Sequence, residues 1–337
     1  MLLVAAMSGA CGGSSSPQST AGTRPSPQSG ASTTTTIPPL ARAIGSVPVG
    51  VRDETFVDTT RSTPANGVAP GAPNRTMVTT IWYPARAAGG GTPGAAVPGA
   101  APDASGGPYP MVVFAHGFAV GPQTYAALLA GWASAGYVVV APALPLLNGA
   151  APGGASHDDY NGPNFVDVDF VLHDALRRAA TTGDVLSGMV DQSRIAVAGH
   201  SDGEVIAYAL GFMACCRDAQ VRSVVAMAGD LANANALPLA TGVPILHMIS
   251  ENDEFNPLAE SLAFDRQSLL APKYTVVLRG ASHLGPFVGS GDSHFDLVLR
   301  ATVDFLDGTL KGGLGLARLA TDVGAAPGIA SLEAVPR

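Results

Sequence analysis

Apolar and polar residues follow two different periods along this chain. Short apolar runs of strand length occur at 110–118, 137–142, 194–199, 221–229, 243–250 and 273–280, and an alternating run occurs at 77–85. Between them, apolar residues recur at helical spacing over 124–136, 164–180, 204–213 and 294–310. Buried strands that alternate with helices predict an α/β fold in three layers, with a mostly parallel central sheet covered on both faces.

The same pattern divides the chain into three parts. Residues 1–42 combine an apolar start with a Ser/Thr/Pro-rich stretch that is too polar to pack, and 43–312 hold the predicted strands and helices. Residues 313–337 are expected to form a C-terminal tail. A Gly/Ala/Pro-rich loop is predicted over 86–108. No apolar run reaches the roughly 18 residues of a membrane-spanning helix, and no internal repeat is found.

The first residues are ordered like a targeting segment. An apolar start reaches a triplet of small residues directly before Cys11, and the polar stretch follows. This order resembles a bacterial lipoprotein export signal. The resemblance implies a lipid on Cys11 and an exported domain, at the cell surface or secreted, that meets the membrane only through this anchor. A flexible tail with an apolar end is the alternative.

Charge and cysteine content narrow the function classes. The net charge is −8 and no cluster of Lys and Arg occurs, which argues against nucleic acid as a partner. Cys215 and Cys216 are adjacent, so they predict either a vicinal disulfide in an oxidising compartment or two buried thiols. No Cys/His group has the spacing of a zinc site. The oligomeric state is left open.

One motif points to nucleophilic chemistry. Residues 194–210 read RIAVAGHSDGEVIAYAL, which places Ser201 between a buried strand and a buried helix in a G-x-S-x-G turn. Small residues are needed on both sides of such an elbow, because strand and helix approach closely and the backbone of the nucleophile is strained. The context therefore favours Ser201 as a nucleophile over a serine of a glycine-rich chain.

A serine nucleophile needs a base and an acid that orients this base. We predict His283 as the base, because it follows the last strand of the sheet between two glycines, and His294 is the second choice. We predict Asp253 as the acid, because it stands in a turn after the strand at 243–250. Asp230, after the preceding strand, is the rival.

Developing negative charge on the substrate calls for backbone N–H donors. We expect one from Asp202, which follows the nucleophile, and one from Phe118 in the FAHGF segment, where Gly117 allows a sharp turn. A carboxylate at Asp202 is unfavourable beside an oxyanion, unless the side chain points away or is paired.

With these motifs the chain resembles the α/β-hydrolases, and closely their branch without a lid. This branch includes dienelactone-hydrolase-like enzymes, platelet-activating-factor-acetylhydrolase-like esterases and bacterial cutinase-like polyester hydrolases. The matching segments are TTIWYPA, VVFAHGF, AGHSDG, SENDEFNP and GASHLGPF, in the order of the family and over about residues 45–312. The resemblance implies a Ser201–His283–Asp253 triad, an ester or related acyl substrate, and no cofactor.

Departures from polyester hydrolases refine this expectation. The tryptophan that usually follows the strand at 221–229 is absent, Asp202 stands where methionine is frequent, and Glu204 replaces a glycine. The first two changes reduce the aromatic binding surface and weigh against polyester cleavage. The short connection between 229 and 243 leaves no room for a sizeable lid, so the site is expected to be open.

The sequence thus predicts a serine ester hydrolase for short to medium acyl esters, with a small-molecule or lipid-like substrate. One alternative is amide hydrolysis, acyl transfer or polyester cleavage by the same triad. The other is a catalytically inactive binding lipoprotein of the same fold, for which the negative charges of Asp202 and Glu204 beside Ser201 are the argument.

Overall fold

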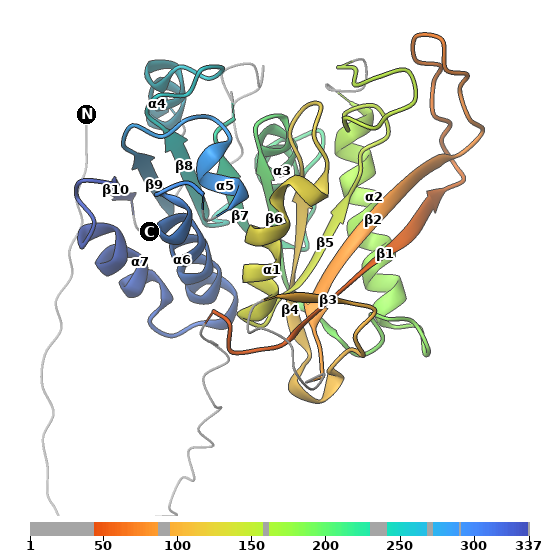
Figure 1. Cartoon of the computed structure of the whole chain (residues 1–337), viewed down its shortest axis with the longest axis horizontal. Helices are drawn as coiled ribbons and strands as arrows, with labels where there is room; N and C mark the ends of the chain where they lie inside the picture. Colours follow the sequence, from red (N-terminus) through yellow and green to blue (C-terminus); the bar gives the residue numbers. More distant parts are fainter. Residues whose placement is uncertain are drawn as a thin grey trace, which may run out of the picture. The chain divides into compact units, whose positions relative to one another are not determined.

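A sheet with the strand order β10-β9-β8-β7-β6-β4-β5-β2-β1-β3 forms the centre of the protein (Figure 1). The computed structural model describes residues 44–86, 95–157, 162–229, 241–267, 272–289 and 291–335. The strands are β1 (Val49–Asp58), β2 (Arg75–Pro84), β3 (Ala96–Pro98), β4 (Tyr109–Ala115), β5 (Val138–Pro142), β6 (Val190–His200), β7 (Val221–Met227), β8 (Ile245–Ser250), β9 (Lys273–Leu278) and β10 (Ala330–Val335).

The middle of this sheet is parallel and buried on both faces. Neighbours in the series β5-β4-β6-β7-β8-β9 all pair in parallel. Every residue of β4, β5 and β8 is buried. Side chains of a strand point alternately to the two faces, so strands without an exposed position need cover on both sides. The predicted α/β fold class is confirmed.

Helices supply this cover on both faces. One apolar cluster unites the α2 and α3 side chains with one face of the sheet, and a second unites α1, α6 and α7 with the other. Figure 1 shows these two groups on opposite sides of the sheet. The helices are α1 (Ala126–Ser134), α2 (Pro163–Ala179), α3 (Asp202–Phe212), α4 (Leu258–Gln267), α5 (Gly285–Val288), α6 (Phe295–Leu306) and α7 (Gly315–Gly324), with short 3-10 helices at Ala104–Gly106 and Pro122–Tyr125 and a π-helix at Asp307–Lys311.

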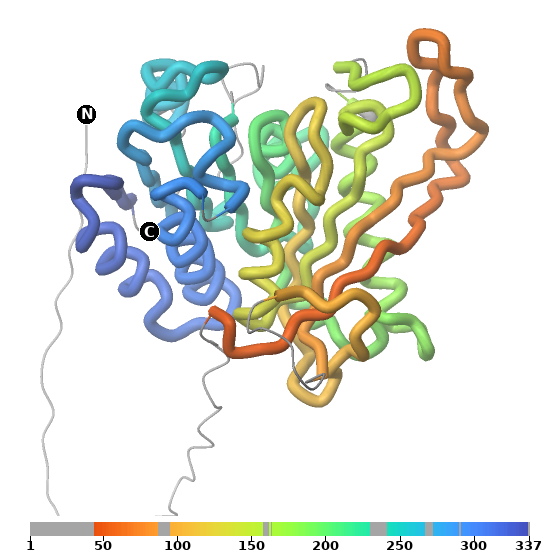
Figure 2. Tube along the Cα trace, viewed as in Figure 1, coloured from red at the N-terminus to blue at the C-terminus, as the bar shows by residue number. Residues whose placement is uncertain are grey.

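The expectation of a C-terminal tail over 313–337 was wrong for the residues that the structure describes. There α7 packs on α6, and β10 pairs antiparallel with β9 at one edge of the sheet. Figure 2 shows this segment in dark blue returning to the sheet. Leu319 and Val323 of α7 are buried against the core. Burial of these apolar side chains stabilises the helix, although hydrophobic periodicity did not predict a helix in this segment.

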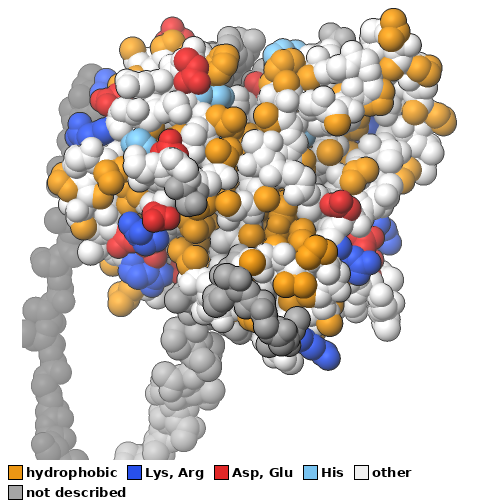
Figure 3. Space-filling view, in the orientation of Figure 1, with side chains coloured by type: hydrophobic (Ala, Val, Ile, Leu, Met, Phe, Trp, Pro, Cys, Tyr) orange, Lys and Arg blue, Asp and Glu red, His pale blue; other side chains and the backbone are white. Residues whose placement is uncertain are grey.

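The described surface mixes charges of both signs. On the face shown in Figure 3, acidic and basic side chains lie in small groups with apolar atoms between them. In the described part of the chain no helix combines the length and the apolar character that a membrane crossing requires. Cys11 and the signal-like segment lie outside the described residues.

The two adjacent cysteines form a disulfide. Cys215 and Cys216 are joined in the connection between α3 and β7. Of the two alternatives that the sequence left open, the structure thus contains the vicinal disulfide.

Candidate active site

Ser201 stands at the tight turn between β6 and α3. Its φ is 55° and its ψ −124°, a conformation that costs energy for a residue with a side chain. Its N–H donates to the carbonyl of Met227 at 2.9 Å. A Cβ on Gly199 would overlap the backbone of Gly203, and one on Gly203 would overlap the carbonyl of Ala115. The two glycines therefore permit the close approach of strand and helix that forms this elbow.

Strained backbone is concentrated at one end of the sheet. Among the described residues other than glycine, Ala119, Ser201 and Ala228 have a positive φ. They follow β4, β6 and β7, which are neighbours in the parallel sheet. Strain of this kind persists only where the surroundings enforce it, and it is frequent at functional sites.

His283 and Asp253 meet in the loops after β9 and β8. The Nδ1 atom of His283 lies 2.8 Å from Oδ2 of Asp253, and the Asp253 side chain is only 2% exposed. The other carboxylate oxygen of Asp253 accepts the N–H groups of Phe255 and Asn256. Burial acts to raise the pKa of Asp253, but the hydrogen bonds from His283 and these N–H groups outweigh it and hold the pKa below its usual value. The carboxylate is therefore ionised and directed at the imidazole.

The neighbouring acidic residues hold the histidine loop through its backbone. Glu254 accepts the N–H of His283 at 3.0 Å, and Glu251 accepts the N–H of Gly280 at 2.7 Å. Three carboxylates after β8 thus have separate tasks, and Asp253 is the one that contacts the ring of His283.

His200 attaches the histidine loop to the elbow. Its Nε2 lies 2.8 Å from the carbonyl oxygen of His283, and its Nδ1 lies 2.8 Å from the hydroxyl of Tyr125. This hydroxyl accepts the N–H of Gly117. Burial is the main cause that lowers the pKa of His200 to about 3. The ring is therefore neutral, with Nε2–H donating to His283 and Nδ1 accepting from Tyr125.

The expected oxyanion loop lies directly against the elbow. A Cβ placed on Gly117 would be 3.0 Å from Cβ of Ser201. His116, before this glycine, is fully buried between the carbonyl of Gly117 and the N–H of Leu144, and burial lowers its pKa to about 4. Phe118 follows, and 38% of it is exposed. The loop is thus held by a second neutral, buried histidine.

His157 connects the side chains of the two expected oxyanion-hole residues. Its ring stacks on Phe118 with centroids 3.9 Å apart, and its Nε2 lies 2.8 Å from Oδ2 of Asp202. Burial raises the pKa of Asp202, and His157 acts against this shift. The sequence required that the Asp202 carboxylate be paired or point away, and the structure pairs it.

The runner-up residues stand elsewhere. His294 contacts Asp292 at 2.7 Å and the carbonyl of Arg279 at 2.8 Å, and not the Asp253 carboxylate. Asp230, the rival acid, lies outside the described residues.

Sequence reasoning missed Tyr125 and His157, and it used Asn256 only as part of the turn that follows Asp253. Each acts by joining two loops that are distant in sequence. No motif marks them, although a tyrosine near the start of a helix and an Asn-Pro turn after a strand were visible signals.

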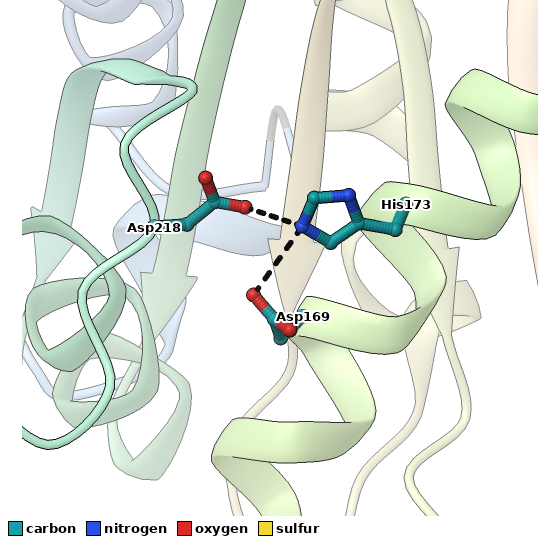
Figure 4. Close-up of side chains that lie close together, drawn as sticks. All are labelled: Asp169, His173 and Asp218. Atoms are coloured by element: carbon teal, nitrogen blue, oxygen red, sulfur yellow. Dashed lines mark ion pairs between the residues drawn. The ribbon is translucent and has the colours of Figure 1, made fainter.

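One group of described side chains could hold a metal ion, away from this site. Asp169, His173 and Asp218 each offer a ligand atom within 4.8 Å of the others (Figure 4). The Nε2 atom of His173 already lies 2.9 Å from Asp218 and 3.8 Å from Asp169. These ion pairs, drawn as dashed lines in Figure 4, account for the group without a metal.

Solved structures share this architecture. The ferulic acid esterase from Streptomyces cinnamoneus is similar with a TM-score of 0.61 and 22% sequence identity, covering 79% of this chain and 91% of that one. The parallel sheet, the strained serine elbow after β6 and the order of the loops are those of the α/β-hydrolase fold, and the chain has this fold.

A more particular likeness covers part of the chain. A family model described as chlorophyllase matches residues 92–230, which include the loop of Phe118 and the elbow of Ser201. The match ends before Asp253 and His283. No curated protein matches the chain. The family match and the structural match together support an esterase of the α/β-hydrolase type.

Proposed function

We propose that this protein is a serine ester hydrolase that acts on short to medium acyl esters through an acyl-enzyme. One observation carries the proposal: the His283–Asp253 pair, 2.8 Å apart, is hydrogen-bonded through His200 to the strained elbow of Ser201. A histidine oriented by a carboxylate, on a loop that is attached to the turn of a strained serine, fits the arrangement that activates a hydroxyl for acyl transfer.

Each residue has a defined role in the proposed mechanism. The hydroxyl of Ser201 attacks the acyl carbon, and His283 takes its proton and returns it to the leaving alcohol. Asp253 holds the imidazole in the tautomer that accepts this proton and stabilises the imidazolium. The N–H groups of Phe118 and Asp202 stabilise the oxyanion. Water then attacks the acyl-enzyme by the same steps and releases the acid.

Two exposed phenyl rings support an apolar acyl substrate. Phe255 is 71% exposed, and its ring meets His283 edge-on with centroids 5.0 Å apart. Phe118 is 38% exposed beside the expected oxyanion hole. Exposed aromatic side chains at a polar site favour a small-molecule or lipid-like ester over a charged substrate. The structural similarity to a ferulic acid esterase supports an ester substrate.

The test is turnover of p-nitrophenyl acetate and butyrate by the full chain, beside Ser201→Ala, Asp253→Asn and Asp230→Asn. Ser201→Ala should fall to background. Asp253→Asn should lose about four orders of magnitude in kcat, because the amide stabilises the wrong imidazole tautomer. Asp230→Asn should stay within a few-fold of wild type.

Other outcomes choose between the alternatives. If Asp230→Asn is the variant that loses most of its activity, Asp230 is the acid that orients the base. Faster cleavage of a matched p-nitroanilide than of the ester favours an amidase. If wild type is as inert as Ser201→Ala and resists a fluorophosphonate, the protein is a binding module. The acidic residues that favoured this last alternative are paired, Asp202 with His157 and Glu204 with His247.

We also propose that the enzyme is exported and anchored through a lipid on Cys11. The order of the N-terminal segment and the disulfide between Cys215 and Cys216 support an oxidising compartment. Metabolic labelling with an alkyne fatty acid should mark the wild type and not Cys11→Ser.

A further inference from the structure

Glu204 is a fully buried carboxylate that the proposed mechanism does not use. It lies in the first turn of α3, and its side chain is 0% exposed. A buried carboxylate costs free energy unless it is paired and hydrogen-bonded. The family resemblance expects glycine at this position, next to the elbow of Ser201. A buried glutamate here therefore needs partners that offset the cost of its burial.

Glu204 connects this elbow to the end of β7. Its backbone N–H donates to the carbonyl of Ser201 at 2.8 Å. Its Oε2 accepts the N–H of Gly229 at 2.6 Å. A Cβ on Gly229 would come within 2.6 Å of Cβ of Glu204, so the two residues are in direct contact. One residue thus holds the strained serine and the strand end beside it.

The connection continues to the acid of the proposed triad. Ala228, before Gly229, has a φ of 49°, and its carbonyl accepts Nδ2 of Asn256 at 2.7 Å. The N–H of Asn256 donates to Asp253 at 2.8 Å. Hydrogen bonds therefore run from Ser201 through Glu204, the end of β7 and Asn256 to Asp253.

A buried series of ion-paired side chains, called the ion series here, holds the carboxylate of Glu204 in place. Its Oε1 lies 3.1 Å from Nε2 of His247 in β8, whose Nδ1 lies 3.2 Å from Asp265 in α4. Asp265 pairs with Lys273 in β9 at 3.2 Å and accepts the hydroxyl of Thr275. Acidic and basic groups alternate, and all four charged side chains are at most 9% exposed.

The charge of His247 follows from these neighbours. Burial acts to lower its pKa, but Glu204 and Asp265 outweigh it and raise the pKa to about 9. The charged groups that face it are Glu204 from α3 and Asp265 from α4, with Lys273 of β9 beyond Asp265. From β7 its pairing neighbour is the uncharged Ala226. His247 is therefore a cation at neutral pH.

We propose that Glu204, held by His247, is a positioning residue that sets the Ser201 elbow relative to the loop of Asp253. The ion series joins the helix after Ser201 to β8, which leads to Asp253, and to β9, which leads to His283. This inference rests on the proposed esterase function. A displacement of the nucleophile by a fraction of an ångström lowers the rate of the chemical step and leaves substrate binding unchanged.

The test compares Glu204→Gln with Asp307→Asn in the full chain. Asp307 is an equally buried carboxylate that pairs with Lys311 at 2.9 Å after α6, outside the proposed site. Both variants replace a buried carboxylate by its amide. Glu204→Gln should lower kcat for p-nitrophenyl butyrate about 10- to 100-fold with KM within about two-fold. Asp307→Asn should lose a similar amount of stability and keep its kcat.

The pH profile of kcat is a second measurement. It would not shift if Glu204 contributed only to stability. The wild-type kcat should decline as pH rises through about 9, where His247 loses its proton. In Glu204→Gln one of the two carboxylates that hold this proton is gone, so the decline should move to lower pH. His247→Gln should lack this decline and serves in place of Glu204→Gln if that variant does not fold.

Three outcomes are decisive. Loss of kcat in Glu204→Gln with a normal Asp307→Asn and a shifted pH profile supports the proposal. If Glu204→Gln retains kcat and merely unfolds more easily, the positioning role is overturned and the esterase function stands. If wild type turns over no faster than Ser201→Ala, both are overturned.

Discussion

Acidification is expected to destabilise this protein through a buried histidine, His200. In the folded state both ring nitrogens are engaged, one with Tyr125 and one with the carbonyl of His283, and burial lowers the pKa to about 3. In the unfolded chain the pKa returns to about 6.5. Below this pH the unfolded state binds a proton that the folded state excludes, so stability falls as pH falls.

The magnitude follows from the two pKa values. One proton bound only by the unfolded state costs about 1.4 kcal/mol for each pH unit, so His200 removes about 3 kcal/mol between pH 6.5 and about 4.5. His116, with a pKa of about 4, adds a loss of similar size over the same range. The stability of a native protein is typically about 5–15 kcal/mol, so the two rings remove a large share of it.

The assay is urea unfolding of wild type and His200→Gln, followed by the fluorescence of the buried Trp82 and Trp132. The amide of glutamine can still donate to His283 but binds no proton. The unfolding free energy of wild type should therefore fall by about 3 kcal/mol more than that of His200→Gln between neutral pH and about 4.5. Between about pH 7 and 8 neither state takes up a proton at His200, so there the difference between the two proteins should stay constant.

A difference that stays constant down to about pH 4.5 would contradict this prediction, because His200 would then accept a proton in the folded state. A difference of the opposite sign would show that the folded protein binds the proton more tightly than the unfolded chain.

Three further predictions concern the same site. Gly199→Ala should abolish soluble expression because its Cβ overlaps the elbow backbone, whereas Gly121→Ala, with open space around it, should keep the melting temperature of wild type. His157→Ala should lower kcat about ten-fold by leaving the Asp202 carboxylate uncompensated beside the oxyanion, and added Asp202→Asn should restore it in a double-mutant cycle. Phe255→Ala should raise KM for the butyrate ester more than for the acetate and change the unfolding free energy by less than about 0.5 kcal/mol, because the ring is 71% exposed.

The sequence predicted the residues of the proposed site that a local pattern marks. Ser201 is recognisable because glycines must flank a nucleophile between a strand and a helix. His283 and Asp253 are recognisable because they follow apolar strands, and the structure brings these two together at 2.8 Å. Asp202 and Glu204 look unfavourable in the sequence alone, because their partners His157 and His247 are distant along the chain.

The sequence by itself determined the fold class, the succession of strands and helices along the parallel core and the place of the elbow. These depend on hydrophobic periodicity and on glycines at positions of close approach, which are local properties of the chain. Only the tertiary structure decided that the last segment joins the sheet as β10 and that a neutral His200 holds the His283 loop. It also decided that His247 is charged between Glu204 and Asp265. The protonation of a histidine depends on which groups surround it, and burial and charge come from residues that are far apart in sequence and close in space.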